Sequence, residues 1–342
     1  MRPLRIAYHA YSLHPRDAFG NVASGQARKG ALLRVQYPGG EQGYADCHPW
    51  PELGDLSLTM QLKKLQTGEW TDLLLRSMEF AWTDAQARSQ GLNLLDVCAI
   101  PPSHFLMPCL ERFTPESLEH CVSQGFRRIK IKLGKNPLEE GQYLVKQLDP
   151  LRALLSSVKV KFRLDFNSSM TEDQVHVFLA QIQPILDFLD FIEDPTPFVA
   201  SAWENIQKRW GIRLALDRFP VTQFESLTPG AFSIVVFKPA IQSMEKIKAL
   251  ALRLDCPLAV TSYLDHPLGQ LCAAKAAGVL QSDPRLKIEE GGLLSHSAYK
   301  ENDFSSALRT NGPFLLPSPG TGFGLNERLA ALTWSPLQGE TA

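Results

Sequence analysis

The chain of 342 residues has six cysteines, and none of them shows the spacing by which cysteines bind zinc or cross-link a small fold. No C-x-x-C pair occurs. The cysteines lie far apart, at Cys47, Cys98, Cys109, Cys121, Cys256 and Cys272. This pattern excludes a zinc knuckle and a small disulfide framework. We expect buried or idle thiols in a reducing compartment, the cytoplasm.

Long apolar runs and an excess of charge of one sign are also missing. The opening residues MRPLRIAYHAYSLHPRD contain no apolar stretch long enough for a signal peptide, and no uncharged stretch of about 18 residues follows. The formal net charge is −1, so no overall field attracts nucleic acid or an anionic membrane. Small neutral or anionic substrates remain possible, because they respond to local charge and not to net charge. No interface pattern predicts an oligomeric state.

A glycine-rich phosphate-binding turn after a first strand, the usual mark of an open doubly wound sheet, is absent as well. The opening of the chain is instead α+β. Residues 4–13 and 30–37 predict strands, and the segment GYADCHPWPELGD predicts a third strand that leaves into a loop. Helical patterns follow up to Gly91, which predicts a helix end. We predict an α+β capping domain over residues 1–100.

From about residue 103, short β-rich runs alternate with amphipathic helical stretches. RRIKIKL, VKFRLDF and FSIVVFK are typical of the runs, and SMEKIKALALRLD is typical of the helical stretches. Seven or eight such units predict parallel strands closed into a (β/α)8 barrel, or a barrel without its last helix. The predicted fold class is α/β, a modified (β/α)8 TIM-type barrel over residues 101–300 with the N-terminal α+β cap. Residues 301–342 would close the barrel or return to the cap.

Five ionisable residues close five successive strand-like runs: Lys132, Asp165, Glu193, Asp217 and Lys238. Each of the intervals, 33, 28, 24 and 21 residues, suits one strand, one helix and two loops. The five groups are therefore expected to gather at the carboxyl ends of the strands, the face where barrel enzymes place their catalytic residues.

Side-chain parity extends this set to residues two positions away. Lys130 lies on the same face of its strand as Lys132, and Arg163, Asp165 and Asn167 share one face of the next strand. Their apolar neighbours occupy the opposite faces. The polar set therefore points into the barrel if the apolar set packs on the helices. Interior charges are costly unless they pair with one another or with an ion.

Asp165, Glu193 and Asp217 would present three carboxylates from consecutive strands to one cavity. Hard oxygen ligands favour Mg²⁺, with Mn²⁺ as a possible substitute, over zinc. A cation would also relieve the mutual repulsion that otherwise raises the pKa values of these acids. Two alternatives need no ion: the acids could cap helices, or they could pair with the lysines. Beside a metal, the pKa of a lysine is expected to fall toward neutrality, which would make it a usable base.

Together these residues resemble the enolase superfamily, in its muconate-lactonizing subgroup. The matching motifs are K-x-K at Lys130 and Lys132, D-x-N at Asp165 and Asn167, E-D-P at residues 193–195, the aspartate of LALDRF and the lysine of VVFKP. The likeness extends over essentially the whole chain. It implies Mg²⁺ on the three carboxylates and a lysine base that forms an ene-diolate.

Within that subgroup the chain is most similar to the o-succinylbenzoate synthase family. GYADCHPWPELGD is similar to a cap segment of that family, with Asp46 in place of the usual glutamate. TSYLDHPLG resembles its strand-seven segment, and PSPGTGFGLN resembles its tail. The resemblance implies dehydration of a cyclohexadiene carboxylate that bears a succinyl arm. The expected substrate-binding residues are Ser262, Asn167, Arg163, Arg28 and Gly320.

The same resemblance gives roles to the three lysines. Lys132 would take the proton α to the ring carboxylate and then protonate the departing hydroxyl in a syn elimination. Lys238 would be a cationic stabiliser on the far face of the substrate. Lys130 would support the carboxylate and tune Lys132.

Other functions remain open on the sequence alone. Lysines on both faces would suit a dipeptide epimerase or an N-acylamino acid racemase, and muconate cycloisomerase uses the same residues. A dipeptide site needs an acidic partner for the substrate's ammonium, which Asp265 could supply unless it caps the following helix. Three basic residues near the start of the chain could bind a succinyl carboxylate or remain solvated: Arg16, Arg28 and Lys29. The last alternative is a barrel without catalytic activity that serves only to bind a ligand. Three histidines are expected to be structural or solvated: His104, His176 and His266.

Overall fold

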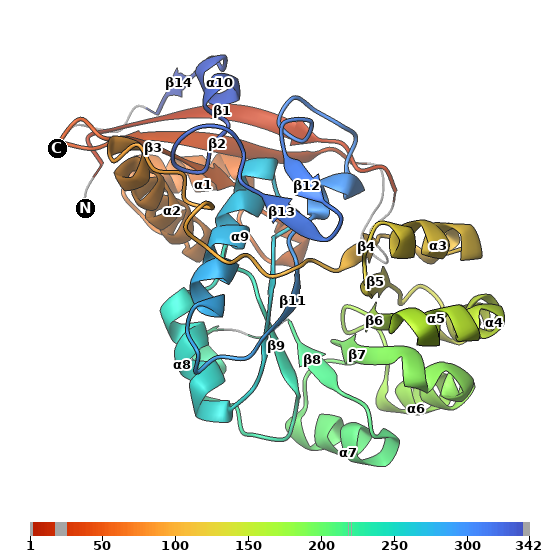
Figure 1. The fold of residues 1–342 in the computed structure, drawn as a ribbon. Helices are drawn as coiled ribbons and strands as arrows, with labels where there is room; N and C mark the ends of the chain where they lie inside the picture. Colours follow the sequence, from red (N-terminus) through yellow and green to blue (C-terminus); the bar gives the residue numbers. More distant parts are fainter. Residues whose placement is uncertain (1–2, 18–25, 218, 220, 338–342) are drawn as a thin grey trace.

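The computed structural model describes residues 3–17, 26–217, 219 and 221–337, and it consists of an antiparallel sheet domain above a parallel barrel (Figure 1). The sheet has the strand order β14-β1-β2-β3. One edge strand of this sheet, β14, comes from the other end of the chain and pairs with β1. The strands are β1 (Arg5–Leu13), β2 (Arg28–Gln36), β3 (Gln42–Cys47) and β14 (Ser335–Pro336).

Two helices cover the inner face of this sheet. A serine or threonine begins each of them, since Ser57 and Thr71 accept hydrogen bonds from the first-turn backbone of α1 and α2. Leu33 and Leu74 are fully buried between sheet and helices. The helices are α1 (Leu58–Gln66), after the 3₁₀ helix η1 (Pro51–Leu53), and α2 (Asp72–Ser89).

The barrel contains eight parallel strands in chain order. A parallel bridge between Ser103 and Gly291 joins the first strand region to the last, so the sheet is nearly closed. This confirms the predicted fold class. The strands are β4 (Phe105–Met107), β5 (Arg128–Lys132), β6 (Lys161–Asp165), β7 (Leu189–Glu193), β8 (Leu214–Leu216), β9 (Ile234–Phe237), β10 (Leu258–Thr261) and β11 (Ile288–Gly292).

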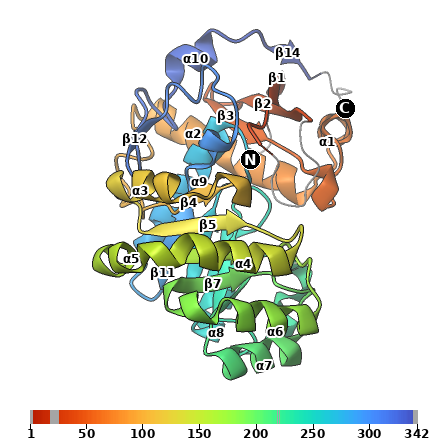
Figure 2. The same cartoon turned by 90° about the vertical axis from the view of Figure 1, so that its right-hand side faces the viewer.

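Helices surround the barrel on the outside, as the second view shows (Figure 2). The predicted alternation is interrupted between β8 and β9, where the described residues form a short 3₁₀ helix, η5 (Val221–Ser226). The α-helices are α3 (Pro115–Ser123), α4 (Pro137–Leu148), α5 (Arg152–Val158), α6 (Glu172–Gln181), α7 (Ala200–Trp210), α8 (Met244–Leu254) and α9 (Pro267–Gln281). Short 3₁₀ helices precede or separate them: η2 (Leu110–Arg112), η3 (Asp149–Leu151) and η4 (Gln183–Phe188).

After β11 the chain does not form another barrel helix among the described residues but returns toward the cap. It contains η6 (Ser295–Ala298), the hairpin of β12 (Arg309–Asn311) and β13 (Phe314–Leu316), and α10 (Asn326–Ala330). In the described part of the chain no helix is long and apolar enough to cross a membrane.

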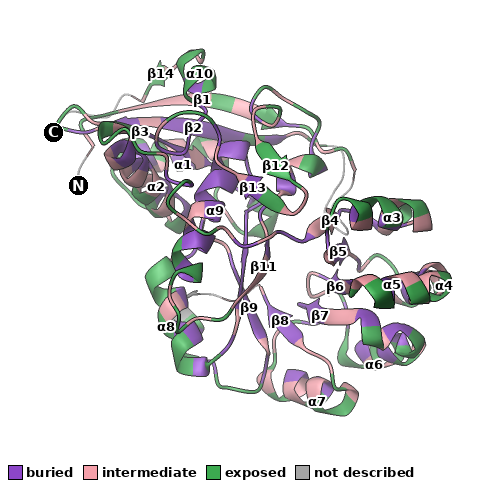
Figure 3. Cartoon of the chain, in the orientation of Figure 1, coloured by how far each residue is buried: buried purple, intermediate pink, exposed green. Residues whose placement is uncertain are grey.

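The strand order determines which residues face each other inside the barrel. In a closed sheet of eight strands, strands four positions apart lie on opposite sides. β5 is therefore opposite β9, β4 opposite β8, β6 opposite β10 and β7 opposite β11. The strands are mostly buried and the outer helices expose one face (Figure 3).

Candidate active site

A cavity of about 730 Å³, mouth included, lies at the carboxyl end of the barrel, where the cap covers it. The cap contributes Trp50 and Leu53 to its wall. The cavity brings together all six predicted catalytic and metal-binding residues. Its barrel lining consists of His104, Leu106, Lys130, Lys132, Asp165, Asn167, Glu193, Asp217, Lys238, Thr261, Ser262, Tyr263, Leu264, Gly292, Leu294 and Ser295.

Three neighbouring strands supply the acidic half of the cavity. Asp165 on β6 and Glu193 on β7 are direct register partners, and both are 2% exposed. Asp217 follows β8, and its backbone N–H donates to Asp194 Oδ1 at 3.0 Å. Asp194 thus fixes the backbone at the third carboxylate.

The lysines pair with these carboxylates in the structure. Lys130 Nζ lies 2.7 Å from both carboxylate oxygens of Glu193 and 2.9 Å from Asp165 Oδ2. Lys132 Nζ donates to Asp165 Oδ2 at 2.7 Å, and Lys238 pairs with Asp217. Lys132 and Lys238 come from β5 and β9, so they approach the cavity from opposite sides.

Crowding and burial change the acidity of several of these groups. Burial and the neighbouring Asp165 raise the pKa of Glu193 to about 7. Burial and Asp217 raise the pKa of Asp194 to about 8. Burial opposes ionisation of Asp165, but the ammonium groups of Lys130 and Lys132 outweigh it and lower its pKa.

The two neighbouring carboxylates raise the pKa of Lys130. Burial alone would lower the pKa of Lys130, but Asp165 and Glu193 raise it above its ordinary value. The reason is that Lys130 contacts two carboxylates directly. These contacts therefore favour the cationic form of Lys130.

The donor set fits a hard divalent cation. Three carboxylates line one cavity, and the Oδ1 atom of Asp217 is buried without a hydrogen-bond partner among the described residues. An unpaired buried carboxylate oxygen is costly, and a cation would satisfy it. As placed, however, no three acidic, histidine or cysteine side chains in the described part of the chain form a metal-binding cluster. Lys130 lies between two of the acids.

The opposite half of the cavity is neutral. It comes from β10, β11 and the segment before β4, which lie across the barrel from the three acids. Ser262 Oγ and Ser295 Oγ share a hydrogen bond of 2.6 Å. His104, Thr261 and Gly292 complete the polar wall, and Leu106 and Leu294 add apolar surface.

Two predicted substrate-binding residues, Ser262 and Asn167, line the cavity. Asn167 adopts a left-handed backbone conformation with φ of 48° just after β6. Its N–H donates to Asp165 Oδ1 at 3.1 Å. The turn therefore holds the first carboxylate in place as well as presenting Asn167.

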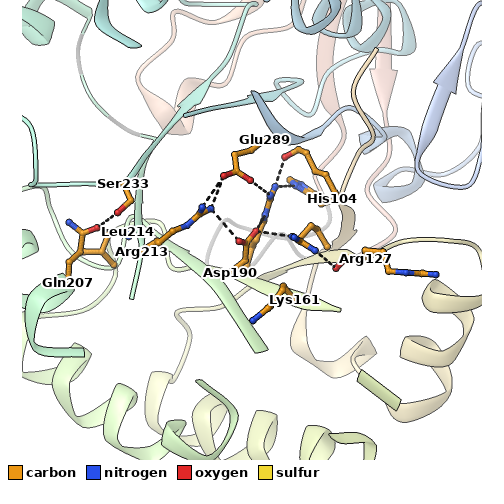
Figure 4. Close-up of polar contacts among 12 residues, drawn as sticks. His104, Arg127, Lys161, Asp190, Gln207, Arg213, Leu214, Ser233 and Glu289 are labelled. Atoms are coloured by element: carbon orange, nitrogen blue, oxygen red, sulfur yellow. Dashed lines mark hydrogen bonds and ion pairs between the residues drawn. The ribbon is translucent and has the colours of Figure 1, made fainter. Parts of the chain in front are cut away.

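Arg163 was predicted to bind substrate, but it lies too deep in the barrel to line the cavity. Arg163 shares a strand face with Asp165 but lies two residues, about 7 Å, closer to the amino end of the barrel. It is fully buried and donates to Asp190 Oδ2 at 2.8 Å and to His104 Nδ1 at 3.2 Å. Asp190, Arg213 and Glu289 form an ionic network at this end of the barrel (Figure 4).

The other basic residues expected near the substrate also lie behind or outside the cavity wall. Arg28 is on β2, pairs with Glu52 and stacks on the Trp50 ring at 4.1 Å, so Trp50 separates it from the cavity. Arg16 donates to the Tyr299 carbonyl at 2.6 Å, and Lys29 is exposed.

Gly320 and Asp265 are likewise outside the cavity. Gly320 is in the C-terminal segment and does not line the cavity; its carbonyl accepts from Asn93 Nδ2 at 2.9 Å. Asp265 is buried at the junction of cap and barrel beside Asp46, because a Cβ on Gly269 would lie within 2.8 Å of both side chains. Asp265 does not cap α9 either, since the N-cap is His266.

Sequence reasoning missed several residues of the wall. His104 was expected to be structural or solvated, yet it lines the cavity; His176 lies outside it and accepts from Trp210 Nε1 at 2.8 Å. Trp50 and Leu53 belong to the cap segment PWPEL, and its likeness to the family's cap segment was the available signal. Ser295 follows β11 and carried no signal in the sequence.

Comparison with known sequences gives two family matches. Residues 6–87 match the family described as O-succinylbenzoate synthase, N-terminal domain, and residues 114–329 match the family described as Enolase C-terminal domain-like. The o-succinylbenzoate synthase of Bdellovibrio bacteriovorus is 32% identical over 337 residues, which covers 98% of this chain and 99% of that protein.

Solved structures show the same fold at lower identity. The dipeptide epimerase of Methylococcus capsulatus, complexed with Mg and the dipeptide L-Arg-D-Lys, has a TM-score of 0.73 at 17% identity and covers 95% of this chain and 99% of its own. The muconate lactonizing enzyme of Pseudomonas putida has a TM-score of 0.70 at 18% identity, with coverages of 96% and 99%. The chain is therefore an enzyme of the enolase superfamily, and it belongs to the o-succinylbenzoate synthase family of lyases.

Proposed function

We propose that the chain catalyses the Mg²⁺-dependent syn dehydration of 2-succinyl-6-hydroxy-2,4-cyclohexadiene-1-carboxylate to o-succinylbenzoate. The observation that carries this proposal is the position of Lys132, in the cavity and beside the acidic half that would hold the substrate's ring carboxylate. The full-length relationship to an o-succinylbenzoate synthase supports it. The proposal includes a place in menaquinone biosynthesis in the cytoplasm and a small carboxylate as the partner.

Asp165, Glu193 and Asp217 would hold the Mg²⁺, or Mn²⁺ as a substitute. When bound, the ion would act as a Lewis acid toward the substrate's ring carboxylate. Lys130, a cation between two of the acids, keeps positive charge beside that carboxylate.

Lys132 performs both proton transfers in this scheme. Its neutral amine takes the proton α to the ring carboxylate, and the resulting ammonium returns a proton to the hydroxyl that departs from the same face, so water leaves. The C–H and C–O bonds break, a ring double bond forms and the ring becomes aromatic. Lys238 approaches from the opposite side and stabilises the negative charge that develops on the carboxylate.

The position of Asp265 argues against a dipeptide substrate. A dipeptide carries an ammonium that needs an acidic partner opposite the metal-binding half. Asp265 was the candidate, but it is buried at the junction of cap and barrel, and the cavity wall opposite the acids is neutral. The described residues of the wall therefore offer no acidic partner for the ammonium of a dipeptide.

Racemisation of an N-acylamino acid is the second candidate. It is favoured by Lys132 and Lys238 on opposite sides of the cavity, because one could remove a proton and the other could return one. An N-acyl group is neutral and compatible with the neutral wall.

The deciding experiment assays o-succinylbenzoate formation by absorbance, with Mg²⁺ present, beside dipeptide and N-acylamino acid panels in deuterated water. We expect dehydration to be the fastest reaction. Proton exchange on amino acid substrates without any o-succinylbenzoate formation would replace the first proposal with the second.

A further inference from the structure

The neutral half of the cavity contains polar groups that the protein itself does not satisfy. Thr261 Oγ1 is buried and has no hydrogen-bond partner among the described residues. The hydrogen bond found for the His104 ring uses Nδ1, through Arg163. Both residues line the cavity, and an unsatisfied buried hydroxyl is a cost that a bound ligand can remove.

The contact with Arg163 determines which ring nitrogen of His104 carries the proton. A guanidinium can only donate, so Nδ1 must accept, at 3.2 Å. Burial, the Arg163 guanidinium and Lys130 also lower the pKa of His104 well below its ordinary value. A neutral imidazole that accepts at Nδ1 has its hydrogen on Nε2. Arg163 is thus a positioning residue for a neutral Nε2–H donor.

The donor lies beside Gly292 in the cavity wall. A Cβ added to Gly292 would lie 3.0 Å from His104 Nε2 and 3.0 Å from the methyl carbon Cγ2 of Thr261, which shares its Cβ with the hydroxyl. The two side chains therefore flank the same point of the wall, at the end of β11. This wall lies across the barrel from the carboxylates, because β4 is opposite β8 and β10 is opposite β6.

We propose that the Nε2–H of His104 and the hydroxyl of Thr261 together bind one uncharged acceptor oxygen of the substrate, the ketone oxygen of the succinyl arm. The inference rests on the proposed function for the identity of the arm. A ketone oxygen has two lone pairs for two donors and carries no charge, which matches a wall without a cation among its lining residues. The subsite thereby selects substrates with a carbonyl next to the ring.

The first test uses a pair of ligands that differ in the ketone oxygen alone. Calorimetry with Mg²⁺ present measures the binding of o-succinylbenzoate and of 4-(2-carboxyphenyl)butanoate, in which a methylene replaces the ketone. We expect the ketone ligand to bind about tenfold more tightly to the unmodified protein. Equal affinities would overturn the proposal.

The variants His104→Met and Thr261→Val remove one donor each at nearly constant volume. Each should weaken o-succinylbenzoate binding by about fivefold to tenfold and leave the methylene analogue unchanged. His104→Gln, which can place an amide N–H near the position of Nε2, should restore part of the loss. His176→Gln is the matched control outside the cavity and should change neither ligand. Losses shared equally by both ligands would indicate a structural effect and contradict the proposal.

A spectroscopic readout separates the subsite from the proposed function. Nitrogen-15 NMR of the histidine rings should show His104 with its proton on Nε2, and the Nε2 resonance should move on titration with o-succinylbenzoate. In Arg163→Gln the tautomer preference should weaken, and in Thr261→Val it should persist. A proton on Nδ1 in the unmodified protein would overturn the inference even if the dehydration assay succeeds. If no dehydration is found, the tautomer and the two-ligand comparison still test the subsite.

Discussion

The two ends of the same barrel contain similar charges with different consequences. At the amino end, Arg163 and Arg213 share Asp190, and Arg213 also pairs with Glu289 (Figure 4). At the carboxyl end, lysines pair with acids, Glu193 has a raised pKa and Asp217 Oδ1 has no partner in the described part of the chain. Arginines stay charged whatever their partners, whereas lysines and crowded acids can exchange protons, and the Oδ1 atom of Asp217 can accept an ion.

This comparison separates structural charge from catalytic charge. Arg163 and Asp165 stand two residues apart on one strand face, yet Asp165 lines the cavity and Arg163 does not. Position along the barrel axis therefore decides which of the two groups can act on a substrate.

The largest expected effect tests the catalytic end. Lys132→Ala should lower kcat by about a thousandfold or more, because it removes the group that both takes and returns the proton. The fold and the affinity for Mg²⁺ should remain largely intact, as circular dichroism and calorimetry would show. Activity close to that of the unmodified protein would exclude Lys132 as the base.

A substitution in the charge network at the amino end of the barrel should instead lower stability and leave activity nearly unchanged. Asp190→Asn would remove the carboxylate that Arg163 and Arg213 share and leave Glu289 as their acidic partner, which should lower the free energy of unfolding by about 2 kcal/mol. Unfolding in urea measures this loss. The kcat of the folded variant, measured at low temperature, should stay within a few-fold of normal. A loss of kcat without a loss of stability would contradict a purely structural role for Asp190.

Glu193→Gln tests the acidic half with a smaller change. It removes one negative ligand at constant size, so the affinity for Mg²⁺ should fall by about tenfold or more. Calorimetric titration of the ion measures this effect. Glu289→Gln at the amino end is the control and should leave the affinity for Mg²⁺ unchanged; an unchanged affinity in Glu193→Gln would contradict the ligand assignment.

A third set of buried charges, at the junction of cap and barrel, predicts a dependence of stability on pH. Burial raises the pKa of Asp265 to about 7, so folding takes up a proton between the ordinary pKa near 4 and pH 7. The folded state binds more protons in this window, so stability is greatest below it and decreases as pH rises through it.

Asp265→Asn removes this titration and leaves the nearby Asp46, Tyr11 and His266 in place. The unmodified protein should therefore lose up to about 1.4 kcal/mol per pH unit relative to the variant between pH 4 and pH 7. Denaturant unfolding at several pH values measures the difference. Parallel curves for the two proteins would show that Asp265 does not titrate in this range.

Strand periodicity and residue identity were enough to predict the lysines and acids of the cavity. Each of Lys132, Asp165 and Glu193 ends a strand, and the parallel order of the strands brings such ends together. The wall opposite them could not be found this way. His104 precedes a three-residue strand, and Ser295 lies in a 3₁₀ helix, so no periodic pattern marks either of them.

The sequence by itself determined the barrel, the cap and the set of charges, because alternation of strands and helices and the period of two along a strand are local properties. Only the tertiary structure decided how deep each charge lies, that Arg163 supports His104 instead of meeting the substrate, and that Asp265 is enclosed at the junction of cap and barrel. Depth and enclosure depend on contacts between residues far apart in the chain. A residue's own neighbours in sequence do not encode them.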